Sequence, residues 1–139
     1  MRSQVLFIST ILLPLIAFSQ ISDTKIPSNV EKYFERNRLG PELVLVKVMD
    51  DDQSGRTLKV KIIARRSKSG KDLAFAFAAA AAVANFADKP IDLLWVEMDI
   101  SFKDTETTMA IAPANCTIDA LIFGNTETEK WWQDCLQFP

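Results

Sequence analysis

The chain has 139 residues, of which 48% are hydrophobic and 24% are charged, and its formal net charge is −2. This composition is typical of a globular protein of one domain rather than of a disordered chain. The weakly acidic balance argues against nucleic acid or an anionic membrane as the main partner. Histidine is absent, which excludes Ser-His-Asp and Cys-His catalysis and histidine-based metal sites.

The N-terminus has the pattern of a cleavable secretory signal peptide. Arg2 precedes an apolar run over residues 5–18, which is short for a bilayer span of about 20 residues. Ala17 and Ser19 place small side chains where a signal peptidase requires them, so cleavage is expected between Ser19 and Gln20. An uncleaved anchor is the alternative. The sequence thus predicts an exported protein, periplasmic or extracellular, with no membrane span after signal removal.

A helix and a hairpin are expected in the first half of the domain. Residues 27–29 resemble a helix start, and Gly40-Pro41 ends that helix. Strands are expected over residues 42–49 and 57–65, joined by the polar turn 50–55. On the first strand, period-two alternation places Val44, Val46 and Val48 on one face. On the second, it points these side chains inward: Leu58, Val60, Ile62 and Ala64.

A long helix and a second hairpin are expected next. Residues 71–88 are rich in alanine, the best helix former. Residues 91–103 alternate apolar and polar side chains and predict a half-buried strand. The partner strand is expected over residues 106–112, with Met109 and Ile111 pointing inward.

The two cysteines, Cys116 and Cys135, predict a disulfide in an oxidising compartment. It closes a loop of about 20 residues and contributes about 3 kcal/mol in the chain-entropy model. Free thiols are the alternative. Short helices are expected over residues 117–123 and 129–136, and the bond would tie the last one to the end of the second hairpin.

This order of elements predicts an α+β fold: a four-stranded antiparallel sheet of two hairpins, with one long Ala-rich helix on one face and short terminal helices. The expected organisation is a signal peptide at 1–19, a flexible N-terminus at 20–28 and a single domain at 29–139. The order is similar to the secretion-chaperone type of α+β fold, whose members form dimers that bind other proteins. The long helix has no polar side chain between Leu73 and Ala84. Its outer face is therefore expected to be covered by the terminal helices or by a second copy, with simple exposure as the alternative.

The outward face of the predicted sheet is a candidate binding surface. It consists of Trp95, Glu97, Asp99, Lys59 and Lys61. Cross-strand charge pairing on a wet sheet face explains the same pattern. Glu97 and Asp99 also form a carboxylate pair, but alternating acids are too common on strands to indicate glycoside chemistry.

The turn at residues 50–55 opens like a calcium-binding loop, with oxygen ligands at alternate positions before a glycine. The position that requires a bidentate glutamate is Lys61. An acidic hairpin turn therefore explains these residues better, and the sequence predicts no metal site and no cofactor.

The sequence favours a non-enzymatic exported domain that binds a protein or a peptide, or that serves a structural role in an envelope. A homodimer or another protein is the expected partner. The alternative is a small-ligand-binding protein with a pocket between the sheet and the long helix. An enzyme that uses carboxylates is the third hypothesis.

Overall fold

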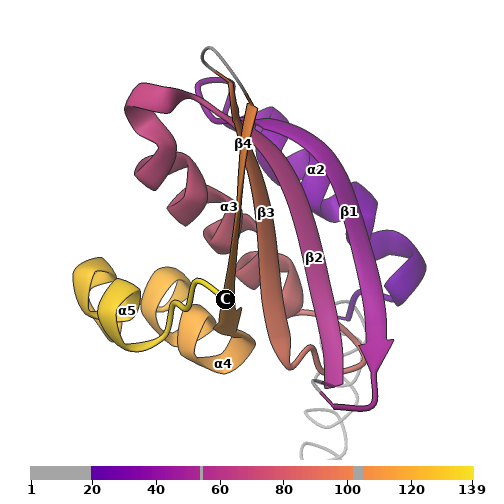
Figure 1. Cartoon of the computed structure of the whole chain (residues 1–139). Coiled ribbons are helices and arrows are strands. Elements are labelled where there is room, and N and C mark those ends of the chain that lie inside the picture. Colours follow the sequence, from indigo (N-terminus) through magenta and orange to yellow (C-terminus); the bar gives the residue numbers. More distant parts are fainter. Residues whose placement is uncertain (1–19, 54, 102–104) are drawn as a thin grey trace, which may run out of the picture.

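The computed structural model describes residues 20–53, 55–101 and 105–139, so the predicted signal peptide at 1–19 lies outside the described residues. The fold is α+β, as predicted, and Figure 1 shows the arrangement of its elements. In chain order they are η1 (Asp23–Lys25), α2 (Ile26–Arg36), β1 (Glu42–Asp51), β2 (Gly55–Ala64), η2 (Arg66–Lys68), α3 (Ser69–Ala84), β3 (Leu93–Ser101), β4 (Thr105–Pro113), α4 (Ala114–Thr117), η3 (Ile118–Ile122) and α5 (Thr128–Asp134).

The four strands form a mixed sheet in the order β1-β2-β3-β4. The two hairpins are antiparallel, but β2 and β3 run parallel where the hairpins meet. The prediction of a purely antiparallel sheet was therefore wrong. The cause is α3, whose 16 residues span about 24 Å, most of the length of a strand of about 30 Å. The helix returns the chain to the end of the sheet at which β2 began, and such a crossover makes the next strand parallel.

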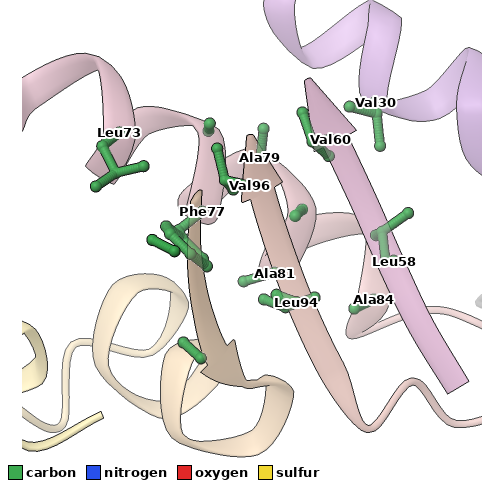
Figure 2. Close-up of a cluster of buried hydrophobic side chains, with 14 of the residues drawn as sticks. Val30, Leu58, Val60, Leu73, Phe77, Ala79, Ala81, Ala84, Leu94 and Val96 are labelled. Atoms are coloured by element: carbon green, nitrogen blue, oxygen red, sulfur yellow. The ribbon is translucent and has the colours of Figure 1, made fainter. Parts of the chain in front are cut away.

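Helices α2 and α3 lie on one side of the sheet (Figure 1). The inward face predicted for β2 is confirmed, and β3 is half-buried as predicted, because alternate side chains of both strands are buried against these helices. They are Leu58, Val60, Ile62, Ala64, Leu94, Val96 and Met98. Figure 2 shows several of them meeting side chains of α3, so core residues occupy the space between the sheet and the long helix.

On β4 the predicted face was wrong. Ala110 is fully buried, whereas Met109 is 39% exposed. The register explains the difference, because Ala110 lies opposite the buried Val96, and Met109 lies opposite Glu97 on the other face. Size and hydropathy favour the larger methionine for the core, but the pairing with β3 decides which residue faces α3.

β1 carries a β-bulge between Leu43 and Leu45, where the register with β2 shifts. A bulge inserts one extra residue and reverses the alternation beyond it. Val44, which was predicted to share a face with Val46 and Val48, is consequently 49% exposed, whereas the other two pack against the core.

Helix α3 is covered on several sides within the chain. One side packs on β2 and β3, another on α2 and a third on α4 and η3. Phe75 contacts the ring of Phe34 in α2 with a centroid distance of 5.0 Å, and Phe77 contacts Trp131 in α5 at 5.4 Å. This intramolecular cover explains why an apolar helix needs no polar stripe along its middle turns.

The predicted disulfide between Cys116 and Cys135 is present, with its Cα atoms 6.3 Å apart. Beside it, the fully buried Trp131 donates a hydrogen bond from Nε1 to the hydroxyl of Thr117, at 3.0 Å. That hydroxyl in turn donates to the carbonyl of Pro113, at 2.9 Å. The bond and this polar chain together hold α5 to the end of β4.

Residues 20–28, expected as a flexible tail, contain η1 and the first turn of α2. The backbone of Ile21 forms a parallel bridge with Ala87, and Ile26 is fully buried. Pro27 occupies the first turn of α2, where its missing N–H has no cost. The helix therefore begins at Ile26, just before the start that the sequence predicted within residues 27–29.

Candidate functional site

We call the sheet surface opposite α2 and α3 the open face. Alternation on β2 and β3 places all five predicted surface residues on it, and their register makes them neighbours. Lys59 lies opposite Trp95, Lys61 lies opposite Glu97, and Asp99 follows on β3. On the flanking strands the register adds Leu45, Lys47, Met49, Thr107, Met109 and Ile111 to the open face.

The charges at the centre of the open face neutralise each other. Lys61 Nζ lies 3.2 Å from Glu97 Oε2 and 3.6 Å from Asp99 Oδ2, and Lys59 Nζ lies 3.8 Å from Glu97 Oε1. The hydroxyl of Thr107 donates to Asp99 at 2.8 Å. The hydrogen bond to Glu97, followed by the charge of Asp99, raises the pKa of Lys61 above its ordinary value. The ionic network is thus ordinary cross-strand pairing, and it leaves no excess charge at its centre.

Trp95 lies beside this network and lines a depression of about 830 Å³. The ammonium of Lys59 lies 4.9 Å from the centre of the indole ring, within the range of a cation–π contact. The indole Nε1 is buried and has no hydrogen-bond partner among the described residues. Leaving such a donor unpaired costs about 1–3 kcal/mol. The remaining lining comes from Met49, Asp50, Asp51, Asp52, Gln53, Thr57, Leu93, Ile111 and Pro139.

The C-terminal end of the chain forms one side of this depression. Gln137 pairs with Ile111 through two backbone hydrogen bonds of 2.8 Å, beside the outer edge of β4. This contact brings Pro139 to the same depression as Trp95. The sequence does not indicate this side of the surface, because no local pattern shows that the last residues return to β4.

The exposed apolar residues of the open face were also missed. Leu45 on β1 is 44% exposed and Met109 on β4 is 39% exposed, and they stand at opposite ends of the cross-strand row that contains Lys61 and Glu97. Both positions depend on features that the sequence does not show directly, namely the bulge in β1 and the register of β4. Arg65, which follows the end of β2, donates two side-chain hydrogen bonds to the buried Asp72 of α3.

The acidic turn between β1 and β2 behaves as a hairpin turn. Asp51 Oδ1 accepts a hydrogen bond from the backbone N–H of Gln53, at 2.9 Å, and Asp50 pairs with Arg56, at 3.2 Å. Gly55 adopts a φ of 78°, in the left-handed region that glycine tolerates best. Within the described residues, no group of three or more potential ligands from histidine, cysteine, aspartate and glutamate could hold a metal ion.

Comparison with protein-family models, with curated proteins and with solved structures finds no match to this chain. Within the ranges that the structure describes, no helix has both the length and the apolar character needed to cross a bilayer.

Proposed function

We propose that the protein is an exported, non-enzymatic domain that binds a protein or peptide segment on the open face of its sheet. The observation that carries the proposal is the open face itself, where Leu45, Met109 and the half-buried Trp95 surround a neutralised ion network. Accessible apolar side chains grouped among polar ones are typical of protein interaction sites. Here α2 and α3 cover one face (Figure 1), and a bound partner would supply the second layer.

The side chains of the open face suit such a contact. Leu45 and Met109 present apolar surface on both sides of the neutralised pair of Lys61 and Glu97. Because these charges already compensate each other, a partner can cover them without burying an unpaired ion. Trp95 would be the central anchor, since tryptophan dominates the binding energy of many interfaces. An acceptor from the partner would remove the cost of its unpaired N–H once the ring turns towards it.

The alternative of a small-ligand pocket between the sheet and the long helix is less favourable. Leu58, Val60, Leu94 and Val96 meet α3 in this space and are fully buried there (Figure 2). A ligand at that position would have to displace the core. We therefore place the proposed site on the opposite side of the sheet.

Export is part of the proposal and rests on the N-terminal pattern together with the disulfide between Cys116 and Cys135, which fits an oxidising compartment. N-terminal sequencing of the protein recovered outside the cytoplasm tests it directly. We expect a chain that begins at Gln20. A chain that still begins at Met1 would contradict the assignment of a cleaved signal.

Binding is tested by selecting peptides from a random displayed library on the purified protein and measuring their affinity for variants. We expect Trp95→Ala to weaken the selected peptides by about 30-fold, which corresponds to about 2 kcal/mol for a hot-spot residue. Phe123→Ala is the matched control, because Phe123 is an aromatic side chain that is 60% exposed and lies outside the open face. A library that yields no peptide whose affinity falls more with Trp95→Ala than with the control would refute the proposal.

A further inference from the structure

β1 is an edge strand, because it pairs with β2 on one side and stands at the end of the sheet. Helix α2 lies next to it (Figure 1). A groove of about 500 Å³ runs between the two elements. Its apolar lining comes from Pro27 and Phe34 of α2 and from residues 43–46 of β1.

The apolar edge of β1 has only part of the usual protection of an edge strand, namely the β-bulge between Leu43 and Leu45. Natural edges carry lysine or proline or are covered by another element, because their free N–H and C=O groups invite pairing with another chain. Residues 43–46 are instead Leu-Val-Leu-Val, and Val44 and Leu45 are 49% and 44% exposed. A bulge twists an edge away from a long, flat partner, but from Leu45 onward β1 keeps regular pairing with β2. An added strand would therefore be short.

The charge of the groove indicates what it binds. Glu31 and Glu35 stand one turn apart on α2, both line the groove and both are exposed. Neither makes an ion pair with any residue in the described part of the chain. Like charges at this spacing repel each other, so a basic side chain in the groove would relieve the repulsion.

A second copy of this chain fits the groove poorly. Pairing β1 with its own copy across a two-fold axis places the same surface on both sides of the contact. The two pairs of Glu31 and Glu35 would then approach each other without a cation between them, which is unfavourable. We therefore propose that the edge of β1 and the groove between β1 and α2 bind an extended segment of another protein, with alternating basic and apolar side chains, by strand addition. This site is separate from the open face and does not depend on the function proposed there.

The test uses short fluorescent peptides of about eight residues, the length of a typical strand. One alternates lysine with valine, a second replaces lysine by glutamate, and a third keeps the lysines but carries N-methyl groups on alternate backbone nitrogens. We expect only the first to bind by fluorescence anisotropy, with an affinity that falls as salt is added. Its binding should shift the backbone amide signals of β1 and α2.

Variants of the protein locate the contact. Glu31→Gln with Glu35→Gln should weaken the lysine peptide by about 5-fold, and Val44→Lys should weaken it further by placing a cation in the groove. Glu106→Gln with Glu129→Gln is the matched control, and it should bind like the native protein. Trp95→Ala should also bind normally, so failure here is distinguishable from failure of the proposed open-face site.

Equal binding of the lysine and glutamate peptides would overturn the proposal, because the charge of the groove would then not select its partner. Normal binding of the N-methylated peptide would also overturn it, because binding would then not require strand pairing. Amide shifts that avoid β1, or a glutamine double variant that binds like its control, would have the same consequence. Sedimentation equilibrium should give the mass of a monomer. A dimer that Val44→Lys dissociates would show that a second copy of the chain occupies the edge of β1. This result would overturn the proposal of a segment from another protein.

Discussion

Removal of the disulfide between Cys116 and Cys135 should lower stability by an amount that follows from the loop it closes. The cysteines are 19 residues apart in the sequence. In the chain-entropy model a loop of this size restricts the unfolded state by about 11 cal/mol/K, or about 3 kcal/mol at 25 °C. For a domain of this size, that loss corresponds to a decrease of about 10–15 °C in Tm. Substituting both cysteines by alanine therefore changes a large fraction of the stability of a typical domain.

The assay is thermal unfolding followed by circular dichroism, with the native protein in its oxidised and reduced forms and with the Cys116→Ala/Cys135→Ala variant. We expect the reduced protein and the double variant to melt at the same lower temperature, with unchanged secondary structure before the transition. The packing of Trp131 against Phe77 does not require the bond, so α5 should remain docked at low temperature. A decrease of less than about 3 °C would refute the reasoning from loop closure.

Three further predictions concern individual side chains. Thr117→Val removes the hydroxyl that receives the Trp131 indole N–H in the core and should cost about 1–3 kcal/mol in urea unfolding; an unchanged midpoint would contradict it. The raised pKa of Lys61, caused chiefly by its hydrogen bond to Glu97, links it to stability that is present below the ordinary value of 10.5 and is lost as pH rises through the raised value. NMR titration should place the Lys61 midpoint above 10.5 and move it down in Glu97→Gln, and a native midpoint at or below the ordinary value would refute this. Ala110→Leu should destabilise by about 1–3 kcal/mol through overpacking, because Ala110 is fully buried opposite Val96; an unchanged midpoint of urea unfolding would contradict this.

The sequence alone determined the features that depend on local pattern. The alternation in β2 and β3 predicted which side chains of each strand share a face, and hence that Lys59, Lys61, Trp95, Glu97 and Asp99 project from the same side. Alanine content predicted the long helix, and the presence of only two cysteines predicted their pairing. Each of these inferences uses a period or a count, which neighbouring residues carry by themselves.

Only the tertiary structure decided how the two hairpins join and which residues reach the surface between them. Whether β3 runs parallel or antiparallel to β2 depends on where α3 returns the chain, and the sequence of neither strand records that position. The exposure of Leu45 and Met109 likewise depends on a bulge and on a register, each of which is set by a partner strand. A shift of one residue exchanges the two faces of a strand, so alternation alone could not show which apolar residues the protein leaves accessible to a partner.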